Sequence, residues 1–145
     1  MDFDLKRFID AQAADFEIAL SELAAGRKKT HWIWYVFPQL EGLGQSDNSK
    51  FYGIKGHDEA RAYLDNAELF KNLDLALSAV YEQVIVSNVD VKDLMGSEID
   101  RMKLFSSLEL FSLMATEVDS FKYANFIFKA NNILAKKPQN RGSNF

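Results

Sequence analysis

Apolar residues recur at three- and four-residue steps through most of this 145-residue sequence, and this spacing is the feature that most limits its fold. Such steps place side chains on one face of an α-helix, whereas a half-buried strand requires alternation. Asp2 or Asp4 can cap the first helix, and Gly26 can end it as a left-handed residue. Its expected inner face consists of Leu5, Phe8, Ile9, Ala13, Phe16, Leu20 and Leu23.

The same periodicity predicts further helices after residue 56. We expect them at 58–64, 67–84, 91–95, 97–116 and from about 119 onward. Ser97 can cap the fourth of these, and Asp119 or Ser120 can cap the last. The last helix is expected to bury Phe121, Ala124, Phe128 and Ile133. The sequence therefore predicts an all-α fold, with one globular domain over residues 1–137 and a frayed C-terminal tail over 138–145.

Composition and charge narrow the classes of function. The chain has no cysteine, so disulfides, thiolate nucleophiles and zinc–thiolate sites are excluded. No apolar run approaches the roughly 20 residues of a membrane span, and Met1–Arg7 lacks the pattern of a secretory signal. We therefore expect a cytoplasmic protein without a membrane partner. The net charge of −4 argues against broad nucleic-acid binding, which requires a basic surface.

The middle of the chain departs from the helical pattern. Residues 38–56 contain Pro38 and four glycines, so we expect an irregular segment there. Just before it, residues 32–37 form an uninterrupted aromatic and aliphatic run. Propensity favours a buried strand for this run, while a short helix capped by Thr30 and closed before Pro38 is the alternative. A lone strand would leave backbone groups unpaired, so the short helix is preferred.

Known catalytic motifs do not occur. The sequence has no glycine-rich dinucleotide fingerprint, no phosphate loop and no nucleophile elbow. His31 and His57 are its two histidines, and neither belongs to a zinc-binding pair, so no metal site or cofactor is predicted. His57 with Asp58 and Glu59 is expected to begin a helix rather than to hold a metal.

One stretch is more particular. It begins at Gly26 and runs through His31-Trp32-Ile33-Trp34 and Phe37-Pro38-Gln39-Leu40 to Gly44-Gln45-Ser46. Together with Arg7–Gln12, Phe51–Ile54 and Glu59–Leu64, it closely resembles the bacterial family called domain of unknown function 1810, over Arg7 to Phe111. The resemblance implies a compact, mostly helical fold and supplies no activity. Family members often carry arginine at the position of Phe105, so the resemblance does not extend to any family site that uses that arginine.

The parts of a nucleotide-like site gather in and around this stretch. His31 can move protons near neutral pH, and on a short helix it would share a face with Trp34. The expected ligand-binding residues are Arg27, Lys28, Trp34, Gln39, Gly44, Ser46 and Tyr52, with His31 as the catalytic candidate. Basic side chains and loop amides suit an anion, a tryptophan can stack on a ring, and a carboxamide both donates and accepts. Lys103 and Ser106 are expected to have a plain solvated or capping role.

Two hypotheses from different classes follow. The first is a protein that binds, or binds and acts on, a small nucleotide-like or other anionic ligand near His31–Ser46. It requires a hollow beside His31, Gln39 and the 42–46 loop, and it expects His31→Ala to abolish binding. The second is a non-enzymatic interaction module, which requires the aromatic residues to form an exposed patch. Specific RNA binding would need the basic cluster and the tail on one face, which the acidic net charge disfavours.

Overall fold

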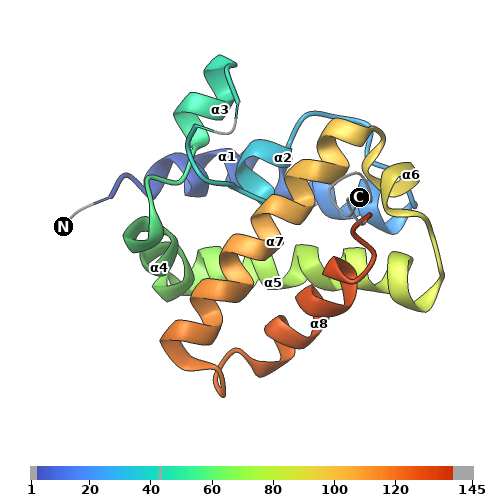
Figure 1. Cartoon of the computed structure of the whole chain (residues 1–145). Coiled ribbons are helices and arrows are strands. Elements are labelled where there is room, and N and C mark those ends of the chain that lie inside the picture. Colours follow the sequence, from blue (N-terminus) through green and yellow to red (C-terminus); the bar gives the residue numbers. More distant parts are fainter. Residues whose placement is uncertain (1–2, 43, 139–145) are drawn as a thin grey trace, which may run out of the picture.

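The computed structural model describes residues 3–42 and 44–138, and over these ranges the chain is all-α (Figure 1). No strand forms in these ranges, where one isolated parallel bridge joins Leu40 to Ile54. The all-α prediction is therefore confirmed. The elements in chain order are α1 (Lys6–Ala24), α2 (Ile33–Val36), α3 (Asp47–Tyr52), α4 (His57–Asp65), α5 (Ala67–Tyr81), the π-helical η1 (Glu82–Val86), α6 (Val91–Met95), α7 (Glu98–Asp119) and α8 (Ala124–Leu134).

Local signals explain several helix ends. The Ser97 hydroxyl accepts a hydrogen bond from the backbone N–H of Asp100 at 3.1 Å, so Ser97 caps α7 as expected. Gly26 follows α1 with a φ of +90°, the left-handed conformation predicted for it. Asp4 does not cap α1, because the helix begins after Leu5 and has no side-chain cap there. Asp2 lies outside the described residues.

The core lies between helices that pack in pairs. α1 packs against α5, and α7 packs against both α4 and α8. Figure 1 shows α7 crossing in front of α5, with α3 standing away from the other helices. The largest fully buried side chains are Trp32, Tyr63, Phe8, Phe37, Phe105, Phe111 and Phe126. Each contributes about 1.5–3 kcal/mol through its removal from water, so aromatic packing holds the fold together.

The aromatic run at 32–37 forms the short helix α2, as preferred from sequence. Trp32, Ile33 and the stretch from Tyr35 to Phe37 are buried, because α2 is enclosed by α1, α3, α5 and α7. Because other helices surround α2, nearly every side of it must be apolar, which explains the uninterrupted run at residues 32–37. Thr30 does not cap the helix; Trp32 holds the N-cap position, and the Thr30 hydroxyl donates to Glu22 instead.

The expected irregular segment contains a helix that the sequence pattern did not reveal. The Ser46 hydroxyl accepts the backbone N–H of Ser49 at 3.1 Å and so begins α3. Two backbone hydrogen bonds of 2.8 Å, from Glu41 to Ile54 and from Ile54 to Gln39, close this excursion at its base. We refer to residues 41–42 and 44–53 as the α3 loop. The segment is polar, and a helix of only six residues is too short to show an apolar periodicity.

The expected inner face of the last helix is partly wrong. Phe121 is 92% exposed and Phe128 is 61% exposed, whereas Phe126 and Ile133 are buried. Residues 120–123 form a turn rather than the first turn of the helix, so α8 begins at Ala124. The inner face of α8 is therefore Phe126, Ala130 and Ile133, at helical steps of four and three.

One buried carboxamide, that of Gln12, is fully paired inside the core. Gln12, whose need for partners follows from its place on the apolar face of α1, donates to the Tyr35 carbonyl at 2.7 Å and to the Tyr63 hydroxyl at 2.9 Å. Its amide oxygen accepts from Asn72 at 2.9 Å. This carboxamide therefore joins α1, α2, α4 and α5. Within the described ranges, none of the helices combines the length and apolarity that a bilayer crossing requires.

Candidate functional site

A cleft of about 500 Å³ lies between the α2–α3 segment and α7. This volume falls within the range of about 300–1,000 Å³ that is typical of small-molecule sites. We call it the Trp34 cleft. It is lined by Trp34, Gln39, Gly44, Gln45, Ser46, Glu98, Ile99, Met102, Lys103 and Ser106. Four of the eight residues expected at a ligand site are therefore brought together: Trp34, Gln39, Gly44 and Ser46.

Local structure positions these four residues. Trp34 is the half-buried residue of α2, whose other side chains are buried. Gln39 accepts the Ile54 backbone N–H through its carbonyl, so its backbone is fixed at the base of the α3 loop. Gly44 approaches Ser49 so closely that a Cβ on it would lie 2.9 Å from the Ser49 hydroxyl. The loop can therefore follow this path only with a glycine at position 44 or with a shift of Ser49.

Lys103 occupies the opposite side of the cleft, on α7. Its Nζ lies 3.5 Å from the centroid of the Trp34 ring, and its side chain is only 17% exposed. An ammonium group over a tryptophan face is a favourable cation–π arrangement. The plain solvated role expected for Lys103 is therefore wrong, and Ser106 lines the same cleft three residues later.

Asp100 connects this lysine to the basic cluster before α2. Its two carboxylate oxygens lie 3.5 Å from Lys103 Nζ and 2.8 Å from Lys28 Nζ. The Lys28 side chain is only 5% exposed, so its charge is already used in a buried ion pair. The expectation that Lys28 binds a ligand anion directly is therefore not supported by this geometry. Its structural role is to hold Asp100, which in turn holds Lys103.

The remaining expected residues do not line the cleft. His31 is exposed and precedes α2, so the helical face that it was expected to share with Trp34 does not exist. Arg27 is also exposed and is not among the residues that line the cleft. Tyr52 packs edge-on against Tyr35, with ring centroids 5.0 Å apart, and burial raises its pKa.

Glu22 fixes the chain segment that carries the basic cluster. Its carboxylate accepts from Lys29 N at 2.7 Å, Thr30 N at 3.0 Å, the Thr30 hydroxyl at 2.7 Å and Trp32 Nε1 at 2.9 Å. Burial alone would raise its pKa, but these four hydrogen bonds to the ionised form lower the pKa to about 2. The segment before α2 is thus held by α1.

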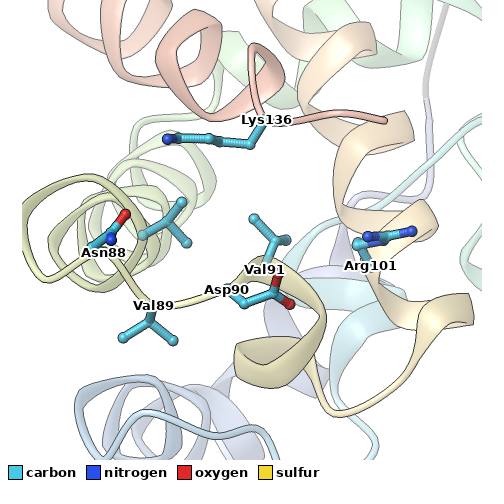
Figure 2. Close-up of a pocket in the computed structure, with 7 residues that line it drawn as sticks. Asn88, Val89, Asp90, Val91, Arg101 and Lys136 are labelled. Carbon is cyan, nitrogen blue, oxygen red and sulfur yellow. The ribbon is translucent and has the colours of Figure 1, made fainter. Parts of the chain in front are cut away.

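A second hollow of about 230 Å³ lies beside η1, α6 and the end of α8 (Figure 2). Figure 2 shows Lys136 reaching across it while the Arg101 guanidinium points away from its centre. Arg101 is paired with Glu98 at 2.6 Å. Because its charged end is turned away, Arg101 does not converge with Lys136 on this hollow. Among residues 3–42 and 44–138, no cluster of three or more potential metal ligands is found.

Sequence reasoning missed six of the ten residues that line the Trp34 cleft: Gln45, and on α7 Glu98, Ile99, Met102, Lys103 and Ser106. A signal for the apolar pair on α7 was present. Ile99 and Met102 are large, exposed apolar residues that lie one helical turn apart, on a side of α7 away from its core face. With Lys103 and Ser106 they form a second face of α7. The core face of α7 is much more apolar, so it dominates the sequence pattern of this helix.

Comparison with known proteins assigns the family. The family model described as protein of unknown function (DUF1810) matches residues 2–132. The chain belongs to this family. It is also similar to the crystal structure of the conserved hypothetical protein Rv1873 from Mycobacterium tuberculosis, with 35% sequence identity and a TM-score of 0.79. That similarity covers 97% of this chain and 94% of the other. No curated protein matches the chain.

Within this DUF1810 protein, several of the residues that carry the family resemblance fall into two groups. Arg7, Gln12 and Trp32 are buried and make structural contacts. Trp34 and Gln39 line the Trp34 cleft instead. Phe105, where relatives were expected to carry arginine, is fully buried in the core. It therefore contributes apolar packing and does not face the cleft.

Proposed function

We propose that this protein binds a small nucleotide-like ligand, with a planar ring and an anionic group, in the Trp34 cleft. The observation that carries the proposal is the Lys103 ammonium held over the Trp34 ring in a cleft of ligand size. An anionic group that enters the cleft can bind this ammonium directly. The aromatic and apolar lining favours a ring beside it.

The local charge supports an anionic ligand although the whole chain has a net charge of −4. Lys28 and Lys103 share one carboxylate, that of Asp100. Arg101 and Glu98 neutralise each other. These five groups carry one net positive charge, and Lys103 is the member of the lysine pair that reaches the cleft. Screening is weaker for such partly buried charges than for exposed ones, so the excess is felt inside the cleft.

The uncharged lining supports a ring with polar edges. Ile99 and Met102 supply apolar surface, and the Gln39 carboxamide offers both a donor and an acceptor. A heterocyclic base presents both kinds of partner along its edge, whereas a purely apolar ring does not. Because His31 lies outside the cleft, the proposal is one of binding and assigns no reaction.

The alternative role as an interaction module has less support. It requires residues 32–37 to expose an aromatic patch, yet Trp32, Tyr35 and Phe37 are buried in the core. Trp34 is half-buried and lies inside the cleft. A partner protein would therefore find no contiguous aromatic surface on this segment.

A thermal-shift screen with AMP, ADP, adenosine and ADP-ribose tests the proposal. A compound that binds only the folded state adds about 2.7 kcal/mol to the stability of the protein at 100 times its dissociation constant. The melting temperature of the protein must therefore rise. We expect Lys103→Met to weaken binding of any compound found by about tenfold or more, since a direct charged contact is lost. Lys71→Met is the matched control, because Lys71 is exposed on α5 away from the cleft.

The arms separate the possible results. Failure of every compound to raise the melting temperature would contradict the proposal, as would equal binding by wild type and Lys103→Met. Far-UV circular dichroism checks that the variant is folded. His31→Ala is a further arm: we expect it to bind as wild type does, and a loss of binding there would restore the imidazole to the site.

A further inference from the structure

A smaller hollow of about 280 Å³ adjoins the Trp34 cleft along α7. We call it the Leu113 hollow. It is lined by Leu40, His57, Ser106, Glu109, Leu110 and Leu113. Ser106 lines both hollows, so the two meet at this residue. The volume of the Leu113 hollow falls just below the range of about 300–1,000 Å³ expected for a complete ligand site, which favours an extension of the neighbouring cleft.

Both hollows follow the same side of α7. Lys103, Ser106 and Leu110 are three and four residues apart, so they occupy successive turns of one helical face. At 1.5 Å per residue, Lys103 and Leu110 are separated by about 10 Å along the helix axis. A ligand whose anionic group binds Lys103 would therefore reach the Leu113 hollow with a chain or ring of modest length.

The chemistry of the two hollows differs. The Leu113 hollow presents leucine side chains from α7 and from position 40. Its one carboxylate, that of Glu109, is paired with Lys137 Nζ at 3.1 Å. An uncharged, apolar group is therefore favoured there, while the positive charge lies at Lys103. His57, the first residue of α4, adds a polar group at the edge of the hollow.

We infer that the two hollows form one groove and that its ligand is a nucleotide ester with an apolar alkyl, acyl or aryl substituent. The nucleotide binds in the Trp34 cleft and the substituent in the Leu113 hollow. This inference rests on the proposed function, since it uses the same anionic contact. It adds the second half of the ligand and the residues that select it.

Two esters of AMP with the same charge test the inference by isothermal titration calorimetry. The methyl ester and the n-hexyl ester differ only in the length of the apolar group. We expect the hexyl ester to bind wild-type protein about tenfold more tightly or better, because five further methylene groups leave water. Leu113→Asp should reduce this preference to about threefold or less, since a carboxylate would face the alkyl chain.

Leu75→Asp is the matched control, because Leu75 is 44% exposed and Leu113 is 47% exposed, yet Leu75 lies on α5. It should keep the full preference for the hexyl ester. Binding of both esters with equal affinity would overturn the groove and leave the proposed function standing. A hexyl preference that survives Leu113→Asp would overturn it too. Failure of both esters to bind would overturn the inference together with the proposed function.

Discussion

At the scale of single residues, the buried ion pair between Arg7 and Glu59 makes hydrogen bonds to several parts of the chain. Arg7 Nη1 and Nη2 meet the two Glu59 oxygens at 2.8 and 3.0 Å, and the backbone N–H of Lys55 donates to the same carboxylate at 2.8 Å. Arg7 also donates to the carbonyls of Phe51 and Gly53. This pair therefore joins α1 to α4 and to the end of the α3 loop.

We expect Glu59→Gln to lower the free energy of unfolding by about 3–5 kcal/mol, because it leaves the Arg7 charge buried without its counter-charge. Urea denaturation measures the loss. Arg61→Ala is the control: Arg61 pairs with Asp58 and Glu117 at the surface, where such pairs contribute about 0–1 kcal/mol. Equal losses in the free energy of unfolding for the two variants would show that the buried pair contributes no more to stability than the surface pairs do.

At the scale of elements, α8 shows how one turn changes the side of a helix that is buried. Residues 120–123 interrupt the helical path between α7 and α8, and the inner face is then set by Phe126 and its neighbours one and two turns later. The two phenylalanines of this helix consequently have opposite surroundings, with Phe126 in the core and Phe128 exposed.

The pair Phe126→Ala and Phe128→Ala makes this difference measurable. The first variant should lose about 3–5 kcal/mol of stability, because it removes a buried ring and leaves a cavity. The second should change stability by no more than about 0.5 kcal/mol, as is usual for exposed positions. Thermal or chemical denaturation of both variants checks the assignment. A larger loss for Phe128→Ala would restore the inner face expected from the sequence.

Elements of sufficient length were predictable because their apolar spacing is unambiguous. The helices around Phe8, Leu77 and Leu108 and the glycine end at Gly26 follow from sequence. The buried face of α8 was not predictable. Spacing counted from Phe121 runs through the turn at residues 120–123, which no glycine or proline marks. Nor was α3 predictable, because its six residues are too few to show periodicity.

Four of the ten residues that line the Trp34 cleft were predictable from sequence, for a related reason. Trp34, Gln39, Gly44 and Ser46 are neighbours in the chain, so a distinctive motif gathers them. Lys103 and Met102 enter the cleft only because α7 packs across α2, which is a long-range contact. The position of His31 depended on where α2 begins: the helix starts at Ile33, two residues after the histidine, so His31 lies outside it.

At the scale of the whole molecule, the buried apolar residues of the described ranges, 3–42 and 44–138, form one continuous cluster. Buried residues from α1, α2, α4, α5, α7 and α8 all belong to it, and Gln12 adds a polar junction among four helices. Because one cluster takes residues from six helices, the unfolding of one helix would expose the packing surfaces of the others.

We therefore expect one cooperative unfolding transition in urea. Tryptophan fluorescence reports on Trp32 and Trp34 in the middle of the chain, whereas far-UV circular dichroism reports on all helices. The two curves should coincide in midpoint and in slope. A separate transition seen by fluorescence alone would show that the α2 region unfolds before the remaining helices.

The α3 loop gives the Trp34 cleft two sides that differ in what a mutation costs. On α7, the cleft residues alternate with the core residues Leu104, Phe105 and Leu108, so changes there are constrained by folding. On the α3 loop, the cleft residues from Gly44 to Ser46 belong to an excursion tied at its base by two backbone hydrogen bonds. Substitutions in this excursion should therefore alter the lining of the cleft without disturbing the packing of the helical core.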